Sequence, residues 1–181
     1  MDVQNVAQLI KVTDFAAKKH RDQRRKDSVQ TPYINHPIGV ASIISEEGGI
    51  NDINILCGAI LHDTVEDTDT TYEEIKELFG EKIRVIVKDC SDDKNLPKQV
   101  RKEKQIEHAP HCCYEAKVVK LADKLYNLRD LERDTPVGWS ENRVNEYFVW
   151  SSKVVKGLRG ACPALEQKLD ELFRKRDILI D

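Results

Sequence analysis

Residues 118–131 read VVKLADKLYNLRDL, and their apolar side chains recur every three or four positions. That spacing predicts an amphipathic α-helix whose apolar side packs into a protein core. Asp123 interrupts the apolar pattern, and a buried carboxylate is costly unless a positive or polar partner accompanies it. Alternatively, Asp123 is exposed beside Lys124 or paired with Lys120. The stretch therefore predicts a helical fold and makes Asp123 a candidate site residue.

The rest of the chain has the same helical period, and no segment alternates like a β-strand over a useful length. Further helices are predicted to start at Asn35, at Asn51 or Asp52, at Thr71 (with Glu74 as a capping box), and at Pro97, Ser140 and Pro163. Glycines and prolines predict helix ends at Gly48, Gly80 and near Pro110. We expect an all-α fold, with residues 1–181 as one domain of about eight to ten helices.

The composition limits the classes of partner. The 181 residues are 40% hydrophobic and 34% charged, enough apolar content for a core and too much for a disordered chain. With 29 basic and 32 acidic residues, the net charge is −3, so there is no overall attraction to nucleic acid or to an anionic membrane. No apolar run approaches the ~20 residues of a membrane span. An anionic ligand would need a local basic cluster or a metal.

The N-terminal residues do not form a basic stretch followed by an apolar one, so no signal peptide is predicted. The five cysteines are odd in number and irregularly spaced, which favours reduced thiols. We therefore expect an intracellular, cytosolic protein. A separate zinc site is not predicted, because the spacing of the candidate ligands matches no zinc-finger pattern; they are interpreted as loop residues, namely His108, His111, Cys112 and Cys113.

Side chains of the metal-ligand type occur in four short segments. His62 and Asp63 follow an apolar run, and each has a carboxylate four positions later, Glu66 and Asp67. In a continuous helix all four groups would point into one region. Acids at the C-terminal end of a helix are disfavoured by its dipole, so a positive charge should compensate them. A divalent cation is a natural compensator, and a structural His–Asp pair is the alternative.

The candidate ligand set combines two imidazoles with two carboxylates, which suits Mn²⁺, Fe²⁺ or Zn²⁺; it consists of His36, His62, Asp63 and Asp123. A divalent cation in such a site lowers the pKa of a bound water and neutralises a phosphoryl oxygen. The pattern therefore indicates metal-assisted hydrolysis.

Five stretches carry a resemblance to a known family: residues 20–26 (HRDQRRK), 31–37 (TPYINHP), 59–69 (AILHDTVEDTD), 71–80 (TYEEIKELFG) and 119–129 (VKLADKLYNLR). In this order they resemble the HD-domain metal-dependent phosphohydrolases. More narrowly, the chain is similar to the hydrolase domain of the RelA/SpoT alarmone enzymes, and most of all to the small stand-alone metazoan SpoT-like hydrolases.

The resemblance implies an all-α domain that hydrolyses guanosine 3′,5′-bis(diphosphate), ppGpp, to GDP and pyrophosphate, usually with Mn²⁺. By position, it makes His36, His62, Asp63 and Asp123 the metal ligands. Glu66 and Asp67 become the catalytic carboxylates, which would orient the attacking water, accept its proton and pass a proton to the departing 3′-oxygen. Which of the two is acid and which is base stays open.

The expected partner is a small-molecule nucleotide. The resemblance favours Arg25 and Lys26 as residues that clamp a phosphate or stack on the base. Asn127 is a candidate contact to ribose or phosphate, and Tyr147 to the purine, although exposed and core positions respectively are the alternatives. A second basic group is interpreted as a solvated surface, with phosphate contact as the alternative; it consists of Lys98, Arg101 and Lys102.

Two other functions remain open at this level. One keeps the metal chemistry and changes the substrate to another nucleotide with a 2′- or 3′-phosphate, such as NADPH. The other is a non-catalytic helical module in which the acids bind a structural ion. The acids Glu66 and Asp67 count against that module, because a structural ion site needs no spare carboxylates.

Overall fold

The computed structural model describes residues 3–179, and within them it contains helices and loops, with one isolated bridge between Arg24 and Pro32. The α-helices are α1 (Val3–Lys19), α2 (Asn35–Ser42), α3 (Ile53–Leu61), α4 (Thr64–Asp67), α5 (Tyr72–Phe79), α6 (Glu81–Cys90), α7 (Lys98–His108), α8 (Tyr114–Arg133), α9 (Glu141–Leu158) and α10 (Pro163–Arg174). A π-helical turn (Ile43–Glu47) extends α2, and a 3₁₀ turn (Ala109–His111) follows α7. The predicted all-α fold is confirmed.

Capping side chains begin three of these helices where the sequence predicted. The Asp52 carboxylate accepts hydrogen bonds from Asn54 N and Ile55 N at the start of α3. Thr71 Oγ1 accepts one from Glu74 N at the start of α5, and Ser140 Oγ one from Arg143 N at the start of α9. Each cap satisfies backbone N–H groups that have no partner within the helix, and is worth about 1 kcal/mol.

The sequence allowed one continuous helix from His62 to Asp67, but the structure has a break there. α3 ends at Leu61, His62 and Asp63 form a turn, and the short α4 follows. Asp67 N still donates to Asp63 O at 2.8 Å, so the chain keeps one helical turn across the break. Thr64 Oγ1 donates to Leu61 O, one of the carbonyls left free where α3 ends.

One hydrophobic cluster connects the helices from Val12 on α1 to Phe173 on α10. α8 supplies much of it, because its apolar side chains are fully or almost fully buried: Val118, Val119, Leu121, Ala122, Leu125, Leu128 and Leu131. Burial of each large side chain contributes about 1.5–3 kcal/mol. The segment that predicted the fold is thus part of the centre of the core.

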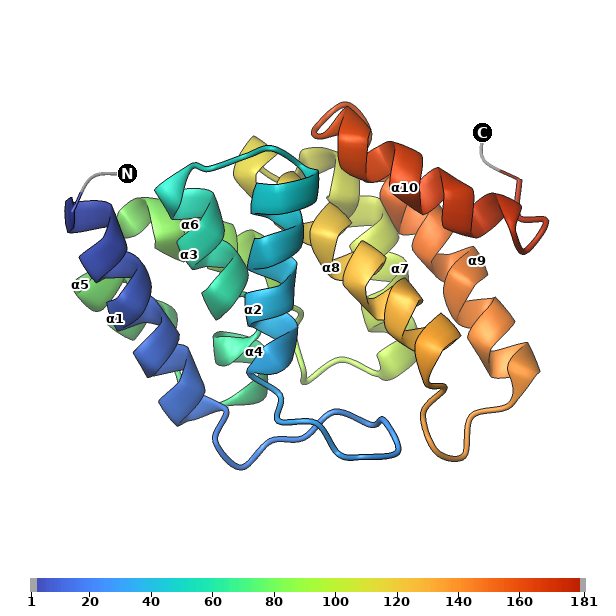
Figure 1. Cartoon of the computed structure of the whole chain (residues 1–181), viewed down its shortest axis with the longest axis horizontal. Helices are drawn as coiled ribbons and strands as arrows, with labels where there is room; N and C mark the ends of the chain where they lie inside the picture. Colours follow the sequence, from blue (N-terminus) through green and yellow to red (C-terminus); the bar gives the residue numbers. More distant parts are fainter. Residues whose placement is uncertain (1–2, 180–181) are drawn as a thin grey trace.

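Figure 1 shows α1, α3, α5 and α6 at one end of the molecule, α8, α9 and α10 at the other, and α2 between them. α2 packs against both α3 and α8. This arrangement brings three segments that are far apart in the sequence to one place. No helix among residues 3–179 has the length and apolarity that crossing a bilayer requires.

Candidate metal and catalytic site

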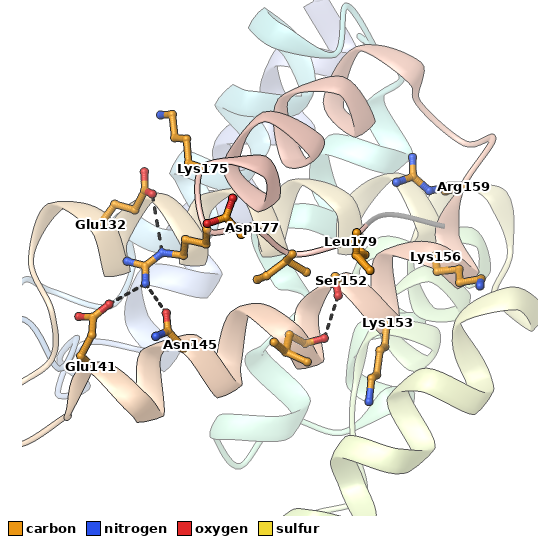
Figure 2. A pocket seen from close by; sticks show the side chains of 13 residues that line it. Glu132, Glu141, Asn145, Ser152, Lys153, Lys156, Arg159, Lys175, Asp177 and Leu179 are labelled. Carbon is orange, nitrogen blue, oxygen red and sulfur yellow. Dashed lines mark hydrogen bonds and ion pairs between the residues drawn. The ribbon is translucent and has the colours of Figure 1, made fainter.

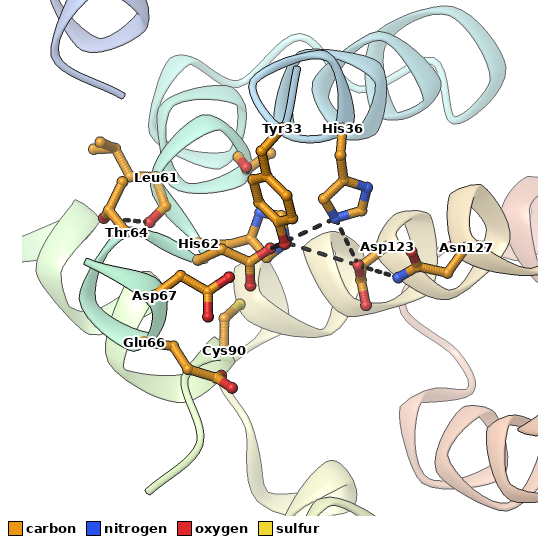
Figure 3. Close-up of polar contacts among 12 residues, drawn as sticks. Tyr33, His36, Leu61, His62, Thr64, Glu66, Asp67, Cys90, Asp123 and Asn127 are labelled. Carbon is orange, nitrogen blue, oxygen red and sulfur yellow. Dashed lines mark hydrogen bonds and ion pairs between the residues drawn. The ribbon is translucent and has the colours of Figure 1, made fainter. Parts of the chain in front are cut away.

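Four ligand-type side chains converge where α2, the end of α3 and α8 meet (Figure 3). His36 Nε2 lies 3.2 Å from Asp123 Oδ1 and 3.6 Å from Asp63 Oδ2. His62 Nε2 lies 3.0 Å from Asp63 Oδ2 and 3.7 Å from Asp123 Oδ1. The structure therefore places the four predicted ligands together, although 87 residues separate His36 from Asp123 (123 − 36).

The two imidazoles are oriented as metal ligands would be. Both His36 and His62 are buried. His62 Nδ1 is 2.6 Å from Ala59 O, an acceptor, so Nδ1 carries a proton and Nε2 faces the carboxylates. A backbone carbonyl behind a histidine is the usual means of fixing the tautomer that ligates a metal. These side chains fit a divalent cation.

The electrostatics of the site call for positive charge. Burial would raise the pKa of Asp63, but the charge of His62 and the hydrogen bonds of His36 and His62 hold it well below its usual value. Burial would also raise the pKa of Asp123, but Lys124 and the two histidines hold it well below its usual value. Both carboxylates are ionised, so the site presents two negative charges to a cation.

Neighbouring side chains fix the direction of these two carboxylates. The Tyr33 hydroxyl donates to Asp63 Oδ2 at 2.6 Å. Lys124 Nζ donates to Asp123 Oδ2 at 2.9 Å, while Asn127 Nδ2 donates to Asp123 Oδ1 at 2.7 Å. The sequence allowed two alternatives for Asp123, exposure beside Lys124 or pairing with Lys120. Asp123 does contact Lys124, but it is not exposed, and Lys120 donates to Cys90 O instead.

Glu66 and Asp67 lie on α4 beside the four-residue cluster (Figure 3). Glu66 Oε2 accepts a hydrogen bond from Asp92 N at 3.0 Å, and Oε1 is 3.4 Å from Arg101. Burial, with the charges of nearby acids, raises the pKa of Glu66 to about 7 despite the hydrogen bond from Asp92 N. A carboxyl group with a pKa close to neutrality can both donate and accept a proton under physiological conditions.

Asp67 is bound differently from Glu66. Its Oδ2 accepts from Gln23 Nε2 at 2.8 Å, and its Oδ1 from Lys94 Nζ at 2.5 Å. Both donors come from loops, Gln23 from the one after α1 and Lys94 from the one after α6. The two adjacent acids therefore have different partners: Glu66 accepts from a backbone N–H and lies beside Arg101, whereas Asp67 accepts from a lysine and a side-chain amide.

Two cavities adjoin at this site and share Arg25, Tyr33, Asn127 and Tyr147. The inner cavity, of about 210 Å³, contains the four ligand-type residues and Glu66. The outer cavity, of about 360 Å³, is lined by basic, acidic and aromatic side chains, among them Lys26, Arg133, Asp67, Asp130 and Trp139. The pair of cavities leads from the surface to the candidate ligands.

All four residues predicted to contact a substrate line these cavities, but their present contacts differ. Arg25 donates to Asn127 Oδ1 at 2.9 Å and Asp130 Oδ2 at 2.8 Å, and its guanidinium is 5.6 Å from the Tyr126 ring centroid. Asn127 thus bridges Arg25 and Asp123 rather than standing free. Lys26 is exposed, and Tyr147 is half-buried.

The sequence did not single out the residues that hold the acids. Tyr33 and Gln23 lie within the stretches that resemble the family, but nothing in their spacing assigned them a contact. Lys94 is in a polar loop, and Arg101 belongs to the basic group interpreted as solvated. Arg101 is instead partly buried against Glu66, so that interpretation is wrong for this residue.

A second group of ligand-type atoms lies at the base of α7, where Asp89, His108 and Cys112 approach within 4.8 Å of one another. Asp89 Oδ2 already accepts a hydrogen bond from Cys113 N. Burial raises the pKa of the Cys112 thiol, which lies within hydrogen-bonding distance of the Asp89 and His108 carbonyls. Cys112 and Cys113 lie in the loop before α8, as interpreted from the sequence. His108 instead ends α7 and His111 ends the 3₁₀ turn, so the interpretation as loop residues is wrong for the two histidines.

The largest cavity, about 1020 Å³, lies far from these groups, between α9 and the segment after α10 (Figure 2). Within it, Arg176 donates to Glu141 at 2.8 Å and to Asn145 at 2.6 Å. None of the predicted site residues lines it. Size alone therefore does not identify the chemical site here.

Comparisons with known proteins agree with this geometry. The model of the HD domain family matches residues 13–145. Proteins named guanosine-3′,5′-bis(diphosphate) 3′-pyrophosphohydrolase MESH1 are 58% identical in Danio rerio (98% of this chain, 99% of the relative) and 60% identical in Homo sapiens (96% and 97%).

A solved structure described as a metazoan ortholog of SpoT that hydrolyses ppGpp superposes with a TM-score of 0.93 at 51% identity, over 96% of this chain and 97% of that one. Its fold and its length both correspond to those of the present chain. The resemblance seen in the sequence is thereby confirmed, and the chain belongs to the HD domain family, among the metazoan relatives of SpoT.

Proposed function

We propose that the protein is a metal-dependent phosphohydrolase that converts ppGpp to GDP and pyrophosphate. The observation that carries the proposal is the convergence of the four predicted ligands, His36, His62, Asp63 and Asp123, beside two further acids in adjoining cavities. The names of the relatives, which describe this same reaction, support the choice of substrate.

The four converging residues would hold the cation, for which we propose Mn²⁺. A mixed imidazole and carboxylate set is compatible with that ion. When bound, the cation would lower the pKa of a water ligand and neutralise charge on a phosphoryl oxygen. Tyr33, Lys124 and Asn127 keep the carboxylate oxygens turned toward it.

Glu66 and Asp67 are the proposed catalytic carboxylates. Glu66, with a pKa of about 7, is able to accept a proton from the attacking water or to return one to the departing 3′-oxygen. Asp67 lies one turn after Asp63 and faces the outer cavity, where it can orient the water or the leaving group. Their different environments suit different roles in the two proton transfers.

The substrate would occupy the adjoining cavities. ppGpp carries two diphosphates, and the net charge of −3 repels it, so local basic groups must attract it. Arg25 and Lys26 line the outer cavity and are placed to bind phosphate or to lie over the base, with Asn127 at the junction. Tyr147 offers an aromatic face for the purine.

We further propose that the chain acts as one domain in the cytosol. The hydrophobic cluster that runs from α1 to α10 supports a single domain, since it joins both ends of the described chain. A small, charged nucleotide as substrate is in keeping with an intracellular location.

The test is an assay of metal-stripped protein reloaded with Mn²⁺, Mg²⁺ or Zn²⁺ and given ppGpp, GTP or NADPH. The proposal expects GDP and pyrophosphate from ppGpp, fastest with Mn²⁺. Release of pyrophosphate should be lost in Glu66→Gln while Mn²⁺ binding persists. Glu77→Gln, at an exposed position on α5, is the matched control. Loaded protein that leaves ppGpp intact contradicts the proposal, and phosphate release from NADPH alone would reassign the substrate.

A further inference from the structure

A chain of three hydrogen-bonded side chains runs from the end of α1 to Asp67. His20 follows the last residue of α1, and its Nδ1 lies 2.7 Å from Gln23 Oε1. Gln23 Nε2 then donates to Asp67 Oδ2 at 2.8 Å. Two backbone hydrogen bonds hold this turn, from His20 N to Ala16 O and from Gln23 N to His20 O. The path ends on a proposed catalytic carboxylate.

The chemistry of the amide gives the path a direction. The side chain of Gln23 has one end that only donates and one that only accepts. A carboxylate accepts, so the amide nitrogen must face Asp67 and the amide oxygen must face His20. An oxygen in that place requires a proton on His20 Nδ1. The three residues thus fit one another in only one protonation pattern.

His20 is suited to hold that pattern. It is 2% exposed, and its ring packs 4.9 Å from the ring of Tyr33, the residue that binds Asp63. Burial lowers the pKa of His20 more than the hydrogen bond to Gln23 raises it, so the imidazole is neutral and has a single ring proton. Its Nε2 is buried with no hydrogen-bond partner among the described residues.

That unpartnered nitrogen bears on the role of the residue. A phenylalanine would fill the same space without a buried acceptor, and an unsatisfied polar atom destabilises a fold. The packing of the core therefore does not explain a histidine here, whereas the donor on Nδ1 does. Gln23, by contrast, reaches the outer cavity and is only half-buried, so without a fixed partner its amide would be free to rotate.

We infer that His20 is a positioning residue for Asp67, which it orients through Gln23; the inference rests on the catalytic role proposed for Asp67. The other partner of Asp67, Lys94, has a side chain that is 49% exposed and comes from a loop. If the Gln23 side chain rotated away, Asp67 would lose its 2.8 Å hydrogen bond from Gln23 Nε2 and would turn toward Lys94. The chain from His20 keeps it directed into the cavity.

The experiment compares His20→Phe, Gln23→Leu and His20→Asn in steady-state hydrolysis of ppGpp with Mn²⁺. We expect His20→Phe and Gln23→Leu to lower kcat by roughly 10- to 100-fold with less than a twofold change in KM, as supporting partners of active groups commonly do. Asparagine places an N–H donor close to the position of Nδ1, so His20→Asn should recover most of kcat.

The double variant His20→Phe/Gln23→Leu separates positioning from general damage. If His20 acts through Gln23, adding His20→Phe to Gln23→Leu should change kcat by less than twofold. Three results would each overturn the inference. They are a double variant whose loss of kcat is the product of the two single losses, an unchanged kcat in His20→Phe, and a loss of kcat in His20→Asn equal to that in His20→Phe. Circular dichroism and the Mn²⁺ affinity of each variant report whether the fold and the metal ligands are intact.

A readout without turnover keeps this inference separate from the proposed substrate. In a long-range ¹H–¹⁵N spectrum of the wild-type protein, the His20 proton should be on Nδ1, and Gln23→Leu should lose that preference. A proton on Nε2 would overturn the inference even in an active enzyme. Absence of wild-type turnover would instead contradict the proposed function and leave the His20 spectrum to decide the hydrogen-bonded chain.

Discussion

Gly39 on α2 and the ring of Tyr126 on α8 lie in such close contact that no side chain fits between them. A Cβ atom on Gly39 would be 2.9 Å from Tyr126 Cδ2 and closer still to Cε2. The Tyr126 ring also packs edge-on against His36, with ring centroids 4.9 Å apart. The spacing of the helices that carry His36 and Asp123 thus depends on a glycine.

We predict that Gly39→Ala separates α2 from α8 and weakens metal binding. The added methyl group would push on the Tyr126 ring, and overpacking of this kind costs about 1–3 kcal/mol. Because His36 lies against the same ring, its Nε2 should move relative to Asp123. Calorimetric titration with Mn²⁺ should show a lower affinity, and urea unfolding a lower stability.

Gly39→Ala/Tyr126→Leu is the matched control, since leucine removes the ring atoms that the methyl group meets. Mn²⁺ affinity should recover at least in part. An affinity that stays low in the double variant would show that the defect lies in α2 itself and not in its distance from α8.

Removal of the cation should destabilise the protein. Without it, two ionised carboxylates and two buried imidazoles face each other within 3.7 Å. Mn²⁺ at about 100 times its dissociation constant should stabilise the folded state by about 2.7 kcal/mol and raise Tm. Differential scanning calorimetry of stripped and reloaded protein measures this, and the gain should vanish in Asp123→Asn but persist in Asp22→Asn, an exposed control. Equal gains in both variants would exclude Asp123 as a ligand.

The stability of metal-free protein should depend on pH through Glu66. Its pKa is about 7 in the folded state against an ordinary 4.5, so the folded protein retains this proton to higher pH than the unfolded chain. Below pH 4.5 Glu66 is protonated in both the folded and the unfolded state, so its ionisation does not change the free energy of unfolding. As pH rises from 4.5 to 7 the unfolded chain alone is ionised, and stability falls by up to about 3 kcal/mol.

Urea unfolding of wild-type and Glu66→Gln protein in EDTA, from pH 4 to pH 8, isolates this effect because all other titrating groups are shared. The free energy of unfolding of Glu66→Gln should rise relative to that of the wild type as pH rises, and the difference should become constant above about pH 7. Parallel curves across the range would show that burial does not raise the pKa of Glu66.

Arg25→Lys should weaken substrate binding while the metal site is unaffected. The guanidinium donates to Asn127 and Asp130 together and lies between two aromatic rings, which a lysine ammonium cannot reproduce. We expect KM for ppGpp to rise by about 10-fold with Mn²⁺ affinity unchanged. Arg174→Lys is the control, since Arg174 is exposed on α10 and lines neither cavity. A similar KM in the two variants would argue against a substrate role for Arg25.

The sequence predicted the helices well because their signals are local. The caps at Asp52, Thr71 and Ser140 and the apolar period of α8 need only nearby residues, and each is found in the structure. The break between α3 and α4 was not predicted, because the His62–Asp63 turn is held by tertiary contacts such as that of Asp63 with Tyr33.

The candidate ligands could be named from the sequence because their residue types are restrictive and their motifs resemble a family. Their supporting partners could not. Arg101 and Lys94 belong to a charged helix and a polar loop, and only the packing of α7 and the preceding loop brings them to Glu66 and Asp67. Charge patterns along a chain do not show which charges will meet across it.

The ligands of the cation lie on α2, on α8 and in the turn after α3, against the central core, whereas the outer cavity is lined in part by the loop after α8. Exchange of residues in that loop would leave the buried framework in place, together with the side chains that hold the ligands and Asp67. Selection acting on such a scaffold has a simple route to new nucleotide preferences: the mouth of the site can diverge while the reaction at its base is inherited unchanged.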